Sequence, residues 1–278
     1  MTGSAVVRTL ALSELECLLD WARAEGWNPG LADAAAFHAA DPHGFFGCFV
    51  DGVFASGISA VRYGNDFGFI GLYIAHPDFR GQGMGRRVWD AGIAHLEGRT
   101  IGLDGVSEQQ QNYASMGFEP FYETIRWSGR LEGAVISEVS NVSADILPAI
   151  IRYDGEIFSQ TREAFLAEWL KPPRLAKALM KDGRARGYGV CRKCSDGFKI
   201  GPLFAMGTTE AVTLLQSLVA ETEGETVHID VPAPQQGFSD YLSEAGFQKG
   251  FTTARMYRGL PPSARTADIF GVTTLELG

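Results

Sequence analysis

The chain repeats one pattern of residues at a constant separation of 129 positions along its 278 residues. The matching residues are Gly117, Thr124 and Arg126 in the first half and Gly246, Thr253 and Arg255 in the second half. In both halves a short apolar strand that ends on an aspartate precedes them, at Asp104 and at Asp230. A shared offset within a shared order of elements is typical of an internal repeat. The sequence therefore predicts a duplicated domain, with chance identity of common residues as the alternative.

Apolar runs and turn signals predict a mixed, mostly antiparallel sheet flanked by helices in each half, an α+β arrangement. Asp51-Gly52 between two apolar runs is a strong hairpin signal. In the first half we predict strands at 5–10, 45–50, 53–63, 67–74, 100–103 and 118–127, and helices at 13–25, 32–39, 83–95 and 110–115. In the second half we predict strands at 135–140, 187–192, 198–204, 227–230 and 247–258, and helices within 144–180 and at 208–221 and 239–244.

A linker near residues 128–134 separates the two halves. We predict a first domain over residues 1–131, a second domain over 132–260 and a tail over 261–278. The tail opens with a proline pair and then carries several apolar residues between positions 269 and 277. Because a disordered segment seldom contains so many apolar residues, we expect the tail to dock on the protein.

The formal net charge of −9 argues against a nucleic-acid partner, which favours a basic face. No apolar run approaches the roughly 18 residues of a membrane-spanning helix, and residues 1–8 lack the pattern of a secretory signal. We therefore expect a cytoplasmic protein without a membrane partner, as a monomer or a homodimer.

The four cysteines include one Cys-x-x-Cys pair, Cys191 and Cys194. A structural zinc site would need further ligands, and a redox dithiol would sit where a strand turns into a helix. Here Ser195-Asp196-Gly197 follows instead, which indicates a hairpin turn. We predict two reduced thiols that flank a turn, and no metal.

The most informative motif lies between Ile74 and Arg87, where a strand ends, glycines follow at positions 81, 83 and 85, and a helix begins. Glycines allow consecutive backbone N–H groups to converge on one point. The helix N-terminus adds the positive end of its dipole there. Further positive charge comes from Arg80, Arg86 and Arg87. The motif predicts a pyrophosphate cradle, with a plain glycine turn before a helix as the alternative.

Two other phosphate-binding motifs do not fit this segment. A dinucleotide-binding Rossmann loop follows a strand of a βαβ unit, whereas this strand belongs to an antiparallel meander. A P-loop is excluded because no Gly-Lys-Ser/Thr follows the glycines.

The run Arg80-Gly81-Gln82-Gly83-Met84-Gly85 resembles the acetyl-CoA signature Arg/Gln-x-x-Gly-x-Gly/Ala of the GNAT (GCN5-related N-acetyltransferase) family. The segment from Tyr113 to Phe118 resembles a second element of that family, Tyr-x-x-x-Gly-Phe. The resemblance covers about residues 6–130. It implies an acetyl-CoA co-substrate and a sheet that splays between two strands to admit the pantetheine arm. By this resemblance the cofactor-binding residues are Leu72, Tyr73, Ile74, Arg80, Gly81, Gln82, Gly83, Met84, Gly85, Arg86, Arg87 and Asn112.

The second half resembles a GNAT domain that has lost its cofactor site, as in a bacterial tandem-GNAT subgroup. Its corresponding loop, Ala205–Thr209, contains one glycine and no arginine. Leu242 takes the place that Tyr113 has in the first half. The resemblance therefore implies that only the first half binds the cofactor.

Acetyl transfer from a thioester to an amine requires a base for the ammonium, stabilisation of the carbonyl oxygen and an acid for the thiolate. The resemblance implies that Tyr113 is the acid, with packing on the pantetheine or the core as the alternative, and that a backbone N–H near Tyr73 or Ile74 stabilises the oxygen. Asp104 is the leading candidate for the base or for binding a cationic amine, with a turn-forming role before Gly105 as the alternative. Weaker candidates are Glu108, Glu123 and His76, and water alone could relay the proton.

We therefore expect an N-acetyltransferase that acts on the primary amine of a small molecule by direct transfer. A protein or peptide acceptor is the first alternative, and it predicts an open groove. The second alternative is a non-catalytic protein that binds or senses acyl-CoA, against which Tyr113 weighs.

Overall fold

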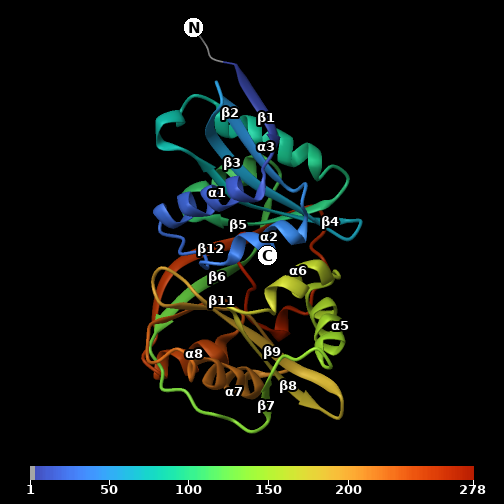
Figure 1. The fold of residues 1–278 in the computed structure, drawn as a ribbon, viewed down its shortest axis with the longest axis vertical. Coiled ribbons are helices and arrows are strands. Elements are labelled where there is room, and N and C mark those ends of the chain that lie inside the picture. The colour runs from blue at the N-terminus through green and yellow to red at the C-terminus, as the bar shows by residue number, and fades with distance from the viewer. Residues whose placement is uncertain (1–3) are drawn as a thin grey trace.

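The computed structural model describes residues 4–278 as an α+β chain, with its two halves drawn one above the other in Figure 1. The first half contains β1 (Ala5–Thr9), α1 (Leu12–Ala24), α2 (Asp33–Ala40), β2 (Phe45–Val50), β3 (Val53–Tyr63), β4 (Phe67–Ala75), α3 (Met84–His95), β5 (Thr100–Val106), α4 (Ser107–Ser115) and β6 (Glu119–Gly129). The second half contains β7 (Val139–Asn141), α5 (Leu147–Phe158), α6 (Glu163–Trp169), β8 (Leu175–Lys181), β9 (Arg184–Lys193), β10 (Phe198–Ala205), α7 (Thr208–Val219), β11 (Val227–Pro232), α8 (Gln236–Glu244), β12 (Gln248–Arg258) and β13 (Ile269–Gly271).

One sheet of 13 strands runs through both halves in the order β1-β2-β3-β4-β5-β12-β6-β11-β10-β9-β8-β7, with β13 paired to β10. Its pairs are antiparallel except for β4 with β5 and β10 with β11. The sheet is therefore mostly antiparallel, in agreement with the predicted fold class.

The two halves exchange their last long strands. β12 of the second half lies between β5 and β6 of the first, and β6 in turn lies beside β11. Thr253 of β12 stands opposite Thr124 of β6, so the residues that mark the repeat meet at the middle of the sheet. The halves are thus repeats in sequence but are joined by shared strands in space. The domain boundaries at 131 and 260 stay a prediction.

Helices cover the sheet of each half, as Figure 1 shows. α3 packs on β2, β3 and β4, and α7 packs on β8, β9 and β10. One buried apolar cluster contains residues of both halves, and in it the rings of Phe37 and Trp169 stack with centroids 6.1 Å apart. Among residues 4–278, no helix combines the length and the apolar character that crossing a bilayer requires.

Two segments of the second half differ from the sequence prediction. The helical region expected up to residue 180 is wrong for Leu175–Lys181, which forms β8. Its Ala, Leu, Lys and Met residues favour a helix, but pairing with β7 and β9 overrides that preference. Asp182-Gly183 makes the turn to β9 with φ of 50° and 72°, the same hairpin signal as at Asp51-Gly52. Of the strand expected at 135–140, only residues 139 and 140 are in a strand, which is β7 (Val139–Asn141).

Candidate active site

The sheet opens between the parallel strands β4 and β5. Their pairing runs from Phe67 opposite Thr100 to Ile70 opposite Leu103, and both strands then continue without pairing to each other. β4 also contains an irregularity at this point, where Leu72 has a φ of 46° and the register with β3 shifts. A bulge of this kind bends a strand away from its neighbour. The opening agrees with the splayed sheet that the family resemblance implies.

The glycine loop lies directly beyond the end of β4 and leads into α3. Gly81 and Gly83 have φ of 73° and 78°, which side chains rarely adopt, and open space surrounds both. The first turn of α3, from Met84, leaves backbone N–H groups without acceptors in the helix. A Cβ at Gly85 would lie 3.0 Å from the Tyr73 hydroxyl, so this position also favours glycine.

The three arginines of the motif differ in their contacts. Arg80 donates a 3.0 Å hydrogen bond to the carbonyl of Ala75 and pairs with Glu25, so it ties the loop to β4 and α1. Arg86 forms an exposed ion pair of 2.7 Å with Asp90. The exposed Arg87 forms no ion pair with the residues that the structure describes. Arg87 is therefore the arginine with the fewest competing contacts for a phosphate.

Tyr113 of α4 reaches the opening from the β5 side. It is buried, and its ring stacks on Trp89 of α3 with centroids 5.7 Å apart. None of the described residues forms a hydrogen bond to its hydroxyl, which lies at a cavity. Burial, assisted by the nearby Tyr73, raises the pKa of Tyr113 to about 12. The hydroxyl therefore stays protonated at neutral pH and can donate a proton or a hydrogen bond.

A cavity of about 350 Å³ lies in this opening and extends toward the second half. Its first part is lined by residues of the first half: Ile70, Gly71, Leu72, Tyr73, Ala75, Gly85, Leu103, Asp104, Val106, Gln109, Asn112 and Tyr113. The remaining lining residues are Trp27, Arg126, Phe251, Thr253, Leu275 and Glu276. The cavity therefore begins at the β4–β5 opening and ends where the two halves meet.

The structure brings some of the predicted site residues together and leaves others outside the cavity. Those that line it are Leu72, Tyr73, Gly85, Asp104, Asn112 and Tyr113. The others, which form the strand end and the loop beyond its mouth, are Ile74, Arg80, Gly81, Gln82, Gly83, Met84, Arg86 and Arg87. The weaker base candidates His76, Glu108 and Glu123 do not line the cavity.

Asp104 is engaged by Arg255 of the exchanged strand β12. The guanidinium donates two hydrogen bonds of 2.8 Å, one to each carboxylate oxygen. The Asp104 side chain is 0% exposed. Burial opposes the charge of Arg255, but Asp104 outweighs it and raises the pKa of Arg255 well above its usual value. The role of Asp104 as the base stays a prediction, and it now requires this ion pair to open.

The sequence did not predict the residues that line the far end of the cavity. Arg126 and Thr253 stood out only as markers of the repeat, and nothing local distinguishes Trp27, Phe251 or Glu276. Arg126 pairs with Asp230 at 2.7 and 2.9 Å and also donates to the carbonyl of Trp27 at 3.3 Å. These residues meet only because β6, β12 and the segment 272–278 converge there.

In the second half, the place that corresponds to the cofactor opening is filled. β10 and β11 pair in parallel only from Phe198 to Ile200, and β13 then pairs with β10. A Cβ at Gly201 would lie 2.5 Å from the carbonyl oxygens of Val272 and Thr273. The segment 269–273 therefore occupies the space between β10 and β11.

Cys191 and Cys194 are free, buried thiols, but both precede the turn at residues 195–197 rather than flank it, because Cys191 lies in β9 and Cys194 directly follows that strand. Burial raises the pKa of Cys191 to about 12, and it raises that of Cys194 as well. No group of three or more metal-ligating side chains occurs among residues 4–278.

Comparison with known proteins places both halves in one family. The profile of the acetyltransferase (GNAT) family matches residues 12–118, and that of an acetyltransferase (GNAT) domain matches 150–271. The chain is 32% identical over 272 residues to holothin acyltransferase of Pseudoalteromonas sp. (strain SANK 73390), which covers 96% of this chain and 92% of that protein.

Solved structures show the same fold. A putative acetyltransferase from Pyrococcus horikoshii superposes with a TM-score of 0.81 at 18% identity, over 99% of this chain and 96% of that one. A tandem GNAT protein from the clavulanic acid biosynthesis pathway superposes with a TM-score of 0.62 at 14% identity, over 93% and 100%. The chain belongs to the GNAT family of acyltransferases, and it carries two GNAT domains in tandem.

Proposed function

We propose that the protein transfers an acetyl group from acetyl-CoA to the primary amine of a small molecule. The observation that carries this proposal is the Tyr113 hydroxyl, free of partners among the described residues, at a cavity that begins at the β4–β5 opening. A proton donor at that point weighs against a binding or sensing protein.

The cofactor is assigned to the first half. We expect the backbone N–H groups of residues 82–87 to hold the pyrophosphate, with Arg87 close by. Residues Leu72–Ile74, where β4 no longer pairs with β5, would hydrogen-bond the pantetheine arm, and Asn112 lines the same cavity. The thioester would then lie beside Tyr113. The second half offers no equivalent space, because residues 269–273 fill it.

The chemistry follows from this placement. The neutral amine attacks the thioester carbon, and backbone N–H groups near Tyr73 and Ile74 stabilise the oxygen as it gains charge. When the carbon–sulfur bond breaks, Tyr113 gives its proton to the thiolate. The tyrosine then recovers a proton from the nitrogen that has become acylated.

The shape of the cavity favours a small acceptor over a protein. Its volume of about 350 Å³ must hold the end of the pantetheine arm as well as the acceptor. Trp27, Phe251 and Leu275 wall its far end. One relative is named a holothin acyltransferase, which supports a small amine of similar size as the acceptor of this protein.

Titration and turnover together test the proposal. Acetyl-CoA and CoA are titrated by calorimetry, and CoA release is then measured with benzylamine, tryptamine, aniline, holothin and a lysine-containing peptide. We expect turnover of at least one small amine and none of the peptide. Binding of acetyl-CoA without turnover of any acceptor would instead favour a sensor, and turnover of the peptide alone would favour a protein acetyltransferase.

A further inference from the structure

We propose that Glu276 is the catalytic residue that binds the ammonium group of the acceptor and removes its proton. This inference rests on the proposed N-acyltransferase function and specifies its acceptor side. It assigns the base to the segment that follows the second domain, rather than to the first domain that holds the cofactor.

Glu276 is the cavity carboxylate with free hydrogen-bonding capacity. It lines the cavity, and only 4% of the residue is exposed. Among residues 4–278, no hydrogen bond or ion pair reaches its carboxylate. The other acidic residue in the cavity wall, Asp104, has both oxygens occupied by Arg255. A buried carboxylate without a partner is costly, so its persistence here points to a cationic ligand.

The backbone around Glu276 is held firmly against the first half. Ser59 of β3 donates a 3.1 Å hydrogen bond to the Glu276 carbonyl, and Tyr63 donates one of 3.0 Å to the carbonyl of Leu277. A Cβ at Gly71 would lie 2.2 Å from the Glu276 carbonyl oxygen, so the segment packs directly on β4. The backbone of Glu276 is therefore fixed beside Gly71, where the pairing of β4 with β5 has ended and where the thioester is expected.

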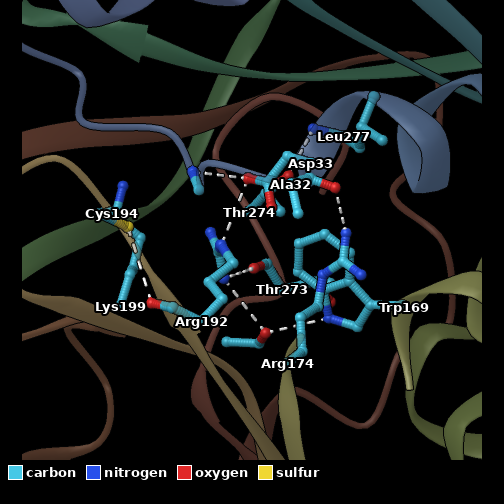
Figure 2. A network of polar contacts seen from close by, with 12 residues as sticks. Ala32, Asp33, Trp169, Arg174, Arg192, Cys194, Lys199, Thr273, Thr274 and Leu277 are labelled. Carbon is cyan, nitrogen blue, oxygen red and sulfur yellow. Dashed lines mark hydrogen bonds and ion pairs between the residues drawn. The ribbon is translucent and has the colours of Figure 1, made fainter. Parts of the chain in front are cut away.

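A buried polar network holds the same segment from the other side, as Figure 2 shows. Arg192 of β9 lies between Asp33 of α2, at 3.3 Å, and the carbonyl of Thr273, to which it donates at 3.4 Å. Thr274 accepts a 2.9 Å hydrogen bond from the N–H of Leu277, which closes a tight turn around Glu276. Residues from both halves thus hold the backbone of the segment that carries Glu276.

The charges near Glu276 support a negative group there. Arg126 and Lys199 are both buried, and the charge of Glu276 acts to raise the pKa of each. Neither side chain forms an ion pair with Glu276. Each already has another partner, because Arg126 binds Asp230 and Lys199 donates to the Trp27 carbonyl at 3.1 Å. The titratable groups that interact with its charge are Arg126, Lys199 and Cys194, and Asp104, Tyr113 and Tyr73 line the same cavity.

The proposed steps balance in atoms and protons. Glu276 takes one proton from the ammonium, and the freed lone pair forms the nitrogen–carbon bond as the carbon–sulfur bond breaks. Tyr113 protonates the departing thiolate and regains a proton from the acylated nitrogen. The products are the amide and free CoA, and the proton on Glu276 leaves to solvent.

The surroundings also define the acceptor class. Trp27 and Phe251 both line the cavity, and the Arg126 guanidinium lies over the Phe251 ring, 5.4 Å from its centroid. These walls suit a primary alkylammonium attached to a flat, apolar body. An alkyl ammonium with a pKa near 10.4 must lose a proton before it reacts, whereas an arylamine is already neutral at pH 7.

The test compares Glu276→Gln with the wild type, using benzylamine and aniline as acceptors. We expect kcat/KM for benzylamine at pH 7 to fall about 100-fold or more, as for loss of a general base. The loss should shrink as pH rises and benzylamine loses its own proton, and it should be much smaller for aniline. Calorimetry with acetyl-CoA should show unchanged affinity. Glu97→Gln, which removes an exposed glutamate of the same charge, should change neither rate.

Glu276→Asp guards against a folding defect, because it keeps the carboxylate and should keep part of the benzylamine activity. An equal loss for benzylamine and aniline, or a full rate in Glu276→Gln, would overturn the assignment while leaving the proposed function intact. If the wild type binds acetyl-CoA but acetylates neither these amines nor tryptamine nor holothin, the proposed function fails and the role of Glu276 fails with it.

Discussion

Arg255 and Asp104 lie 151 positions apart in the sequence, yet they form a bidentate ion pair with both N–O distances at 2.8 Å. A second pair, Arg126 with Asp230, has the same form at 2.7 and 2.9 Å. Each pair joins a strand of one half to an exchanged strand of the other. The duplicated aspartates and arginines therefore bind crosswise, and they hold the two halves together at the rim of the cavity.

Replacing Arg255 by Met should strongly destabilise the protein. The variant leaves the Asp104 carboxylate buried and unpaired, and such a loss costs roughly 3–5 kcal/mol. Urea denaturation measures the change in the free energy of unfolding. Arg86→Met, which breaks an exposed pair, is the control and should cost about 1 kcal/mol or less. A similar small effect of both variants would contradict the structural role of the Arg255–Asp104 pair.

The Asp230 pair predicts a dependence of stability on acid. Burial opposes ionisation of Asp230, but Arg126 and Lys199 outweigh it and lower its pKa to about 2, from 3.8. This lowered pKa stabilises the folded state above pH 4 by about 2 kcal/mol, and the stabilisation is lost as pH falls from 4 to 2. The free energy of unfolding, measured by urea denaturation at each pH between 7 and 2, should therefore decrease less as pH falls for Asp230→Asn than for the wild type.

Asp240→Asn, on the exposed side of α8, is the matched control for that series. Its free energy of unfolding should decrease between pH 4 and 2 as steeply as that of the wild type. If Asp230→Asn also keeps that slope, the lowered pKa of Asp230 is refuted.

Gly83→Ala should weaken acetyl-CoA binding by about tenfold or more. Its φ of 78° suits glycine, and a side chain there would shift the N–H groups that begin α3. Gly98→Ala is a close control, because Gly98 has a φ of 79° and open surroundings but lies outside the loop. Both variants should lose about 1 kcal/mol of stability, while calorimetry should show weaker acetyl-CoA binding only for Gly83→Ala. Equal affinities would argue against the cradle.

Tyr113→Phe should lower kcat by about 100-fold or more and leave acetyl-CoA affinity unchanged, since it removes only the proton donor. The pKa of about 12 also predicts no loss of activity from Tyr113 ionisation up to about pH 11. Steady-state rates between pH 6 and 11 check the loss of kcat and the pH dependence, and calorimetry checks the acetyl-CoA affinity. The control is Tyr241→Phe, whose hydroxyl accepts a hydrogen bond from Gln216 away from the cavity. A wild-type rate in Tyr113→Phe would remove its assigned role.

The local parts of the site could be predicted from the sequence. Positive φ at Gly81 and Gly83 and a helix from Met84 follow from a glycine run between a strand and an amphipathic segment. The position of Tyr113 follows from its place on a short helix after β5. These features depend only on residues that are close in the sequence, so a short segment contains all the information that predicts them.

The acceptor end could not be predicted in this way. Arg126 and Arg255 were visible as repeat markers, but their crosswise pairing depends on strand exchange, which leaves no local pattern. In the sequence Glu276 is one polar residue in an apolar tail. Its position in the cavity depends on packing against Gly71 and on the hydrogen bond from Ser59, both more than 200 positions away. β8 was missed because its residues favour a helix and only its neighbouring strands make it a strand.

Mass spectrometry of the products tests the central claim most directly. Wild-type protein is incubated with acetyl-CoA and either benzylamine, tryptamine or holothin, and the amide and the released CoA are quantified together. We expect the wild type to form the N-acetylated amine in a one-to-one ratio with CoA, and we expect almost none with Tyr113→Phe. CoA release without any acetylated amine, or equal amide formation by Tyr113→Phe, would contradict that claim.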